Sequence, residues 1–192
     1  MTKKIDFYFD FISPYTYLAH KKIQLLPKNI KIKYKPIFLG GLHNLEGITA
    51  PAFIKSKLKN MINDCKLIAK KNEVDFLWNS KFPLNSLNIM RGLFSVNSIN
   101  IDQYINIMFN AFWVQNLDIT KEEILISLLE KYKIDVNNFF KTIKNTAIKT
   151  KLKNATYNAY KKGVFGAPTF IVNNKIFWGQ DRLNYAIDEY KK

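Results

Sequence analysis

An aromatic segment that ends at a Ser-Pro pair limits the folds open to this chain more than any other feature. Residues 5–11 alternate in character and are rich in aromatic side chains, which predicts a β-strand. Ser13 is a preferred helix N-cap and Pro14 a preferred first helical residue, so a helix is expected to follow at once and to stop near Pro27. Residues 30–38 alternate apolar side chains with lysine and predict a second strand. This order indicates a parallel β-α-β unit.

The last part of the chain returns to strand character. Residues 169–172 and 175–178 are apolar and flank Asn173-Asn174, which predicts a hairpin with a tight turn. Gly163 is expected to stop the helix before it. Asp181 is expected to cap a final helix over 182–190.

Between these strands the apolar residues recur at helical spacing. Thr120 with Glu123 predicts a capping box at the start of one of these helices. The other helical segments are expected at 52–71, 86–96, 102–113, 135–144 and 146–162. The predicted fold class is therefore α/β, a βαβ…ββα core that carries a large all-helical insertion.

Composition excludes several classes of protein. The chain has 192 residues, which fits one domain or one domain with an insertion, and no stretch approaches the ~18 apolar residues of a membrane span. We find no secretory signal and expect a cytoplasmic protein. The one cysteine, Cys65, excludes an intramolecular disulfide and a CxxC motif, and its apolar helix face predicts a buried, inert thiol. We expect no metal site.

The net charge of +15 raises the question of nucleic-acid binding. Only Arg91 and Arg182 are arginines, and arginine is the residue preferred for recognising bases and phosphates. We therefore interpret the lysines as a solvated coat and expect no nucleic-acid partner, although an anionic ligand would still be attracted.

Glycine and proline are scarce, so their clustering is informative. Of seven glycines and six prolines, Gly163, Gly166, Pro168 and Gly179 fall within residues 163–179. A proline just before a strand is a candidate for a cis peptide bond, here between Ala167 and Pro168, although a trans proline that opens an edge strand is the commoner case.

Ser13 has two possible uses at its strand-to-helix junction. Its hydroxyl can cap the helix, or it can face an anion together with the backbone N–H groups at the positive helix end. Both uses draw on one hydroxyl, and the local sequence leaves the choice open.

Motifs along the whole chain resemble one family. The segments at both ends carry the most specific resemblance, and those between them fall in the same order. The chain resembles the 2-hydroxychromene-2-carboxylate isomerases and kappa-class glutathione transferases, relatives of DsbA, at residues 7–19 (FYFDFISPYTYLA), 38–41 (FLGG), 82–87 (FPLNSL), 111–114 (AFWV), 163–170 (GVFGAPTF) and 177–183 (FWGQDRL).

The resemblance implies a thioredoxin-like fold with an all-helical insert. The thioredoxin-like part would comprise residues 1–42 and 161–192, and the insertion residues 43–160. It also implies that glutathione is the cofactor and that Ser13 contacts its sulfur and stabilises the thiolate. The glutathione-binding residues that it implies are Ser13, Ala167, Pro168, Gly179, Gln180, Asp181 and Arg182.

The substrate side departs from the family pattern. Relatives usually carry a lysine shortly after the double glycine, in a loop where this chain has Leu42, His43 and Asn44. His43 and Asn44 are candidate substrate-binding residues, and Asn85 and Trp113 could line the same cleft. Trp113 is equally suited to the core.

These observations predict a glutathione-dependent isomerase that acts on an unsaturated aromatic catabolite, or on another small electrophilic substrate, and that forms a homodimer as its relatives do. One alternative is a kappa-class-like glutathione transferase or peroxidase. Another is a non-catalytic thioredoxin-fold binding protein. A disulfide oxidoreductase is disfavoured, since Ser13-Pro14-Tyr15-Thr16 occupies the place of a CxxC motif.

Overall fold

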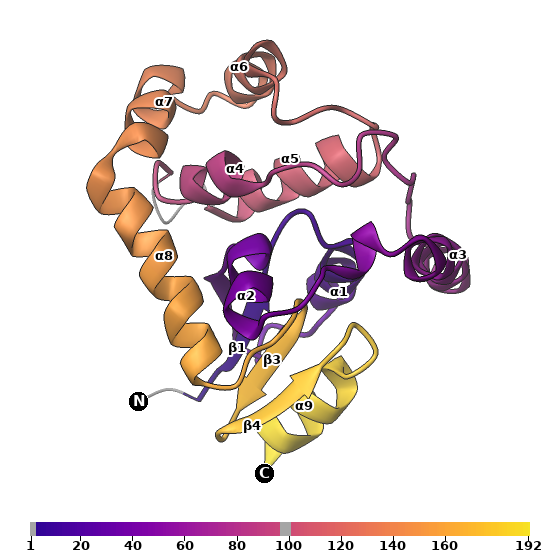
Figure 1. The fold of residues 1–192 in the computed structure, drawn as a ribbon. Coiled ribbons are helices and arrows are strands. Elements are labelled where there is room, and N and C mark those ends of the chain that lie inside the picture. Colours follow the sequence, from indigo (N-terminus) through magenta and orange to yellow (C-terminus); the bar gives the residue numbers. More distant parts are fainter. Residues whose placement is uncertain (1–2, 97–100) are drawn as a thin grey trace.

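The computed structural model describes residues 3–96 and 101–192, and a four-stranded mixed sheet lies at its centre (Figure 1). β1 (Ile5–Phe9) pairs in parallel with β2 (Ile32–Pro36), and β3 (Thr169–Val172) and β4 (Lys175–Trp178) follow in antiparallel. The strand order is β2-β1-β3-β4, which confirms the predicted β-α-β unit and hairpin.

Alternation along the strands divides the core between the two faces of the sheet. Phe7, Phe9 and Phe170 are fully buried on one face, together with the apolar sides of α1 (Pro14–Gln24) and α9 (Leu183–Lys191). Tyr8 faces the other way and packs with residues of α2 (Leu39–Glu46) and α8 (Thr146–Lys161). Both faces are therefore covered by helices.

Except for the α8 residues that pack with Tyr8, the helical insertion packs on the first of these faces, so one core runs through both parts of the molecule. The Phe109 ring lies 5.0 Å from the Phe11 ring, centroid to centroid. No helix among the described residues is long and apolar enough to cross a membrane. The elements of the insertion are η1 (Pro51–Phe53), α3 (Lys55–Lys71), α4 (Leu87–Gly92), α5 (Ile101–Trp113), α6 (Glu122–Lys131) and α7 (Val136–Lys144), followed by α8.

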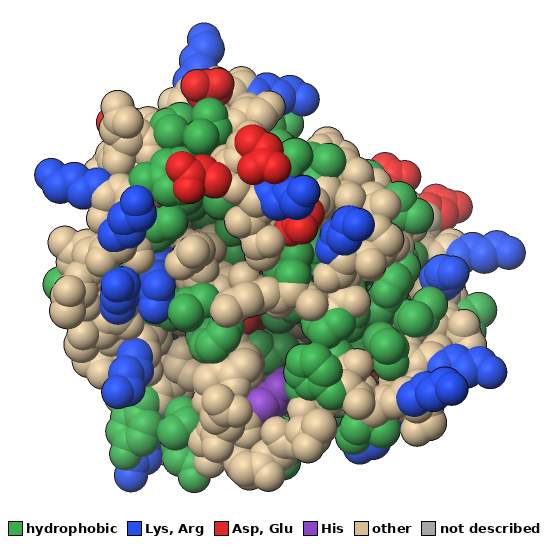
Figure 2. All heavy atoms as spheres, turned by 45° about the horizontal axis from the view of Figure 1, so that its top comes forward, with side chains coloured by type: hydrophobic (Ala, Val, Ile, Leu, Met, Phe, Trp, Pro, Cys, Tyr) green, Lys and Arg blue, Asp and Glu red, His purple; other side chains and the backbone are tan. Residues whose placement is uncertain are grey.

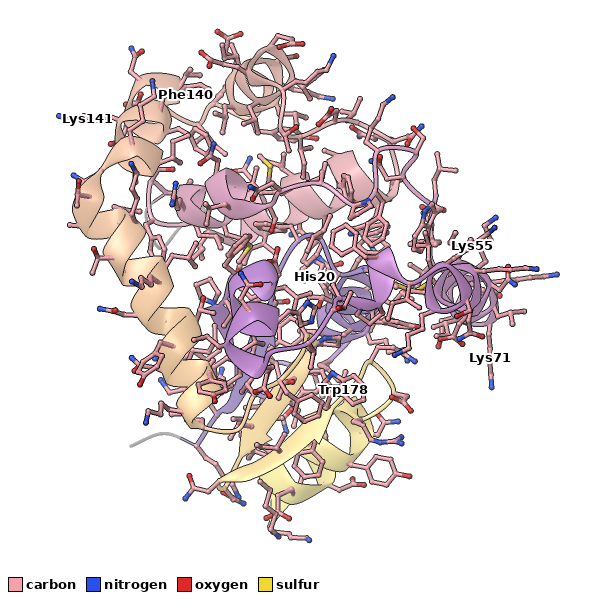
Figure 3. All side chains as sticks on the ribbon, viewed as in Figure 1. His20, Lys55, Lys71, Phe140, Lys141 and Trp178 are labelled. Atoms are coloured by element: carbon pink, nitrogen blue, oxygen red, sulfur yellow. The ribbon has the colours of Figure 1, made fainter. Side chains whose placement is uncertain are left out.

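His20 on α1 links the sheet to the insertion (Figure 3). Its Nδ1 lies 2.7 Å from the Tyr34 hydroxyl and its Nε2 lies 2.9 Å from Oδ1 of Asn106 on α5. The Asn106 oxygen can only accept, so Nε2 donates to it, and in the neutral ring Nδ1 accepts from the Tyr34 hydroxyl. Burial lowers the pKa of His20 to about 4, in agreement with this arrangement.

The predicted turns and helix stops are confirmed. Asn173 and Asn174 have φ values of 50° and 60°, the left-handed conformation that a tight hairpin needs. Gly163 has a φ of 83° directly after α8. Asparagine and glycine adopt this conformation at low cost.

Three local predictions were wrong. Residues 39–46 form helix α2 and not a loop, and the proposed domain boundary between residues 42 and 43 falls inside it. Thr120 makes no capping box, because its hydroxyl donates to Asp118 at 2.6 Å and α6 begins after Lys121. Arg182, not Asp181, is the N-cap of α9, and it makes no capping side-chain hydrogen bond there.

Candidate active site

Ser13 caps α1 and also contacts the loop that precedes β3. The backbone N–H of Thr16 donates to Ser13 Oγ at 3.2 Å, and Ser13 Oγ donates to the carbonyl oxygen of Ala167 at 2.9 Å. The side chain is almost completely buried. One hydroxyl therefore serves as cap acceptor and as donor, and its proton points to the loop in which the cis proline was predicted.

The turn that carries Ser13 is held from below by Asp10. The Ser13 N–H donates to the Asp10 carbonyl at 3.2 Å, and the buried Asp10 carboxylate accepts from Leu39 N–H at 2.7 Å and from Ile12 N–H at 3.2 Å. Burial raises the pKa of this carboxyl to about 6, opposed by hydrogen bonds of which the one from Leu39 is the largest. Asp10 thus joins the Ser13 turn to the first turn of α2.

A cavity of about 900 Å³ opens beside Ser13. It is walled by the start of α1, by α2, by η1 with the start of α3, by the 82–86 loop and by the 165–167 loop with Trp178. Apolar side chains form most of this wall: Ile12, Pro14, Tyr15, Phe38, Leu39, Ile48, Ala50, Pro51, Ala52, Phe53, Met61, Phe82, Pro83, Leu84, Phe165, Ala167 and Trp178.

The mouth of the cavity keeps large apolar side chains in solvent. Phe53 is 72% exposed and Trp178 is 53% exposed. Figure 2 shows a histidine in a hollow bordered by hydrophobic side chains, with the Lys and Arg side chains of this face mostly around the periphery. An apolar opening of this kind suits an organic ligand better than a nucleic-acid backbone.

Few polar groups reach the cavity. His43 on α2 lines it, and burial lowers the pKa of its imidazole, opposed by the charge of Glu46. Lys57 on α3 supplies a cationic side chain to the lining. Asn44 is exposed and is not part of the lining, so the two neighbouring candidates of α2 have different surroundings.

Asn85 and Trp113 are separated by the structure. Asn85 lines the cavity, and its side-chain oxygen accepts from Leu87 N–H at 3.0 Å. Trp113 is fully buried and its indole N–H donates to the carbonyl oxygen of Phe11 at 2.9 Å. Trp113 is therefore a core residue that supports the Ser13 turn from behind and does not line the cavity.

The loop opposite Ser13 has the predicted cis peptide bond between Ala167 and Pro168. Ala167 lines the cavity, and Pro168 is buried behind it. Gly166 lies against the Trp178 indole, where a Cβ atom would come within 2.7 Å of Nε1. A side chain at position 166 would displace Trp178, so the glycine keeps this wall in place.

The 179–182 turn lies outside the cavity lining. Gly179 has a φ of 116°, and Asp181 Oδ2 accepts from Arg182 Nη1 at 2.7 Å in an exposed ion pair. Gln180 is buried, and its side-chain oxygen accepts from Lys22 of α1 at 2.5 Å. The turn thus presents a carboxylate and a guanidinium, and Lys22 of α1 brings an ammonium to Gln180.

Sequence reasoning missed Lys22 and the apolar mouth. Lys22 lies in the last turn of α1 and has no motif around it, so only the contact with Gln180 reveals it. Phe53 falls within the helix predicted over 52–71, and Ile48 lies in a segment without regular spacing between Gly47 and Pro51. Apolar residues at or just before the start of a predicted helix are the sequence signal from which the apolar mouth of the cavity could have been predicted.

The donors and charges present fit glutathione. The tripeptide has a thiol, backbone amide groups and a zwitterionic γ-glutamyl end. Ser13 offers a hydroxyl at a helix N-terminus, and the exposed Asp181–Arg182 pair offers the charges that a zwitterion requires. The remaining apolar wall leaves room for a second, organic ligand.

Comparisons with known proteins identify the family. The model of the DSBA-like thioredoxin domain matches residues 4–191. A 2-hydroxychromene-2-carboxylate isomerase from Sphingobium xenophagum is 31% identical over 189 residues, with 96% of each chain covered. Glutathione S-transferase kappa 1 from Rattus norvegicus is 25% identical, over 93% of this chain and 87% of its own.

Solved structures give the same result. A 2-hydroxychromene-2-carboxylate isomerase structure superposes with a TM-score of 0.86 at 26% identity, covering 96% of this chain and 92% of that one. The cytosolic disulfide reductase DsbM from Pseudomonas aeruginosa, solved with GSH, has a TM-score of 0.68 at 13% identity and covers 98% and 96%, which shows the shared fold. The chain therefore belongs to the DSBA-like thioredoxin-domain family, and its full-length similarity to isomerases and to a kappa-class transferase makes it an enzyme of that group.

Proposed function

We propose that the protein is a glutathione-dependent isomerase of the 2-hydroxychromene-2-carboxylate isomerase type. The observation that carries this proposal is the position of Ser13, at a helix N-terminus, in contact with Ala167 and on the wall of a large apolar cavity. Bound glutathione would supply a thiolate nucleophile for reversible addition to an unsaturated substrate. The relatives named as isomerases cover nearly the full chain.

Ser13 can serve the ligand without giving up its structural role. Its oxygen already accepts from Thr16 N–H, and this bond fixes the oxygen at the helix end. The hydroxyl proton, which now points at the Ala167 carbonyl oxygen, can rotate toward an anion in the cavity. A hydrogen bond to a charged acceptor is stronger than one to a neutral carbonyl, so the hydroxyl would donate to a thiolate in preference to the Ala167 carbonyl.

The other contacts would hold and orient the tripeptide. Ala167 lines the cavity beside the cis Pro168, and the cysteinyl segment would pair with its backbone there. Asp181 and Arg182 would exchange their mutual ion pair for the ammonium and carboxylate of the γ-glutamyl end, with Gly179 and Gln180 shaping that turn. His43, Asn44 and Asn85 would contact the second substrate, Asn44 through a shift of its exposed side chain.

A second candidate is a kappa-class-like glutathione transferase, favoured by the 25% identity to the rat enzyme. Both candidates use the same cavity and the same glutathione contacts. We propose a cytoplasmic location in either case, since the cytosol maintains a reduced glutathione pool. We also propose a homodimer, as the resemblance to the family implies. Sedimentation across micromolar concentrations tests the dimer.

Calorimetry with glutathione, followed by an absorbance assay with 2-hydroxychromene-2-carboxylate, tests the proposal. Glutathione binding together with glutathione-dependent isomerisation is the expected result. Binding without isomerisation, but with conjugation of 1-chloro-2,4-dinitrobenzene, would replace the isomerase by the transferase. No binding at millimolar glutathione would leave only a thioredoxin-fold binding protein.

A further inference from the structure

A second cavity lies in the helical insertion, among α4, α6, α7 and α8. Its volume of about 240 Å³ equals that of about eight liquid water molecules. It shares no lining residue with the cavity beside Ser13. Three cationic side chains from three helices line it: Arg91 of α4, Lys144 of α7 and Lys149 of α8. Glu122 of α6 is the acidic residue of the same lining.

Arg91 is unusual because arginine is rare in this chain and because one of its donors has no partner. It is one of two arginines in a chain that otherwise uses lysine. Its Nε is buried and has no hydrogen-bond partner among the described residues, while Nη1 donates to Asn88 Oδ1 at 3.3 Å. A buried donor on a charged group is unfavourable when it is left unpaired, so the guanidinium would gain by turning Nε toward an acceptor in the cavity.

The three cations also lack counter-charges. Within the described ranges, neither Arg91, Lys144 nor Lys149 forms an ion pair within 4.0 Å, and Glu122 forms none either. Lys144 at the end of α7 has an ordinary role there, since a cation is stabilised at a helix C-terminus. That role does not explain why side chains of α4 and α8 converge on the same space.

The remaining lining adds polar donors on one side and an apolar wall on the other. Thr120 lies before α6 and its hydroxyl already donates to Asp118, whereas Glu122 is the first residue of α6, a helix with no side-chain cap. The first amide groups of α6 therefore have no capping side chain and suit an acceptor. Leu125, Phe140 and Ile143 form the apolar wall, with Phe140 on α7 (Figure 3). A ligand that combines an oxyanion with an apolar group would use both sides.

We propose that this cavity binds a phosphomonoester, with its phosphate held by Arg91, Lys144 and Lys149 and its organic group against Phe140. Arginine forms paired hydrogen bonds with phosphate oxygens, which explains an arginine at this position. The proposal is independent of the proposed glutathione site, because the two cavities are lined by different residues.

Calorimetric titration at constant ionic strength, with phenyl phosphate and with inorganic phosphate as probes, tests the proposal. Phenyl phosphate is expected to bind at least about fivefold more tightly, since its ring can bury apolar surface. Equal affinities would overturn the assignment of a phosphomonoester. Arg91→Gln is expected to weaken binding of phenyl phosphate about tenfold or more, because it removes a charge-assisted pair of bonds.

Two exposed positions keep the test independent of any effect of Arg91 on folding. Lys149→Gln is expected to weaken binding about three- to tenfold, and Glu122→Gln to strengthen it by a similar factor, since the acid repels the phosphate. Lys153→Gln, one turn along α8 and outside the lining, removes the same charge and is the matched control. Equal losses in Lys149→Gln and Lys153→Gln would show a diffuse charge effect and overturn the site, as would no change in Glu122→Gln.

Discussion

The Ser13 hydroxyl donates to the carbonyl oxygen of Ala167 over 2.9 Å, and this bond joins residues 154 positions apart in the chain. Ser13 opens the first helix and Ala167 precedes the third strand, so the bond holds together the two halves of the thioredoxin-like core at the wall of the cavity. The same oxygen accepts from Thr16. The proton of this hydroxyl is the part that can be redirected.

Ser13→Ala should lower activity much more than it lowers glutathione affinity. The hydroxyl would act on the sulfur, while the rest of the tripeptide is held by other groups. Losing a hydrogen bond to a charged group, about 1.5–3 kcal/mol, should reduce the thiolate fraction at neutral pH roughly 10- to 100-fold. Ultraviolet thiolate absorbance of the complex, followed against pH, measures this fraction directly.

Ser56→Ala is the matched control, since Ser56 is another hydroxyl of the cavity lining, on α3. It should leave the thiolate titration unchanged. If Ser13→Ala also left the titration unchanged while lowering the melting temperature, Ser13 would be a helix cap only.

Trp178 should report glutathione binding by fluorescence. It is 53% exposed and lines the cavity, whereas Trp113 is fully buried. Covering the Trp178 indole with ligand should shift its emission to shorter wavelength. Trp178→Phe should abolish the response while calorimetry still detects binding. A response that persists in Trp178→Phe would come from another tryptophan, such as Trp78, whose ring lies 4.9 Å from that of the cavity residue Phe82, and Trp178 would then not be the reporter.

Asp10 and His20 should make opposite contributions to the pH dependence of stability. In the folded protein the pKa of Asp10 is raised from 3.8 to about 6, so across that range the unfolded chain has lost a proton that the folded protein keeps. The free energy of unfolding therefore falls as the pH rises through it. The pKa of His20 is lowered from 6.5 to about 4, so the unfolded chain holds the extra proton and the free energy of unfolding rises with pH.

Single substitutions should separate the two contributions to the pH dependence of the free energy of unfolding. Asp10→Asn should leave a rising curve between about pH 4 and 6.5, and His20→Gln a falling curve, each by about 2–3 kcal/mol across the range. Urea unfolding at a series of pH values measures both. Asp6→Asn, in β1 just before Asp10 and partly exposed, is the matched control. Parallel curves for all three variants would show that these burial effects are absent.

Asp181→Asn should weaken glutathione binding without changing the rate at saturation. The exposed carboxylate is expected to meet the γ-glutamyl ammonium, far from the reacting sulfur, and such binding is equal in the ground state and the transition state. A rise in KM of about tenfold with unchanged kcat is expected. Asp188→Asn, an exposed acid further along α9, should change neither constant. A fall in kcat would place Asp181 at the reacting centre.

Local chemistry made much of the core predictable from the sequence. Ser13-Pro14 encodes a helix start in its own side chains, and Asn173-Asn174 encodes a tight turn because asparagine tolerates positive φ. These signals act within a few residues. The hydroxyl of Ser13 was read as serving either the helix or a ligand, and the structure shows that acceptor and donor functions of one hydroxyl can be divided between neighbours.

The features that sequence reasoning missed depend on distant contacts. Two glycines argue against a helix at 39–46, yet the Asp10 carboxylate accepts from the first amide of α2. The Phe38 ring packs so closely on this helix that Cβ atoms at Gly40 and Gly41 would come within 3.1 Å of it. Trp113 has the same helical spacing whether it faces a core or a cleft. The hydrogen bond from the Trp113 indole N–H to the Phe11 carbonyl oxygen shows that the side chain belongs to the core.

The cavity beside Ser13 has walls from both the sheet-based core and the helical insertion, and this has a thermodynamic consequence. A molecule that touches both walls binds only when the two parts are folded against each other. Binding therefore stabilises the packing of the two parts against each other, by about 2.7 kcal/mol at a ligand concentration one hundred times the dissociation constant. Glutathione should accordingly protect α2, η1 and α3 from proteolysis and amide exchange more than it protects the distant helices α6 and α7.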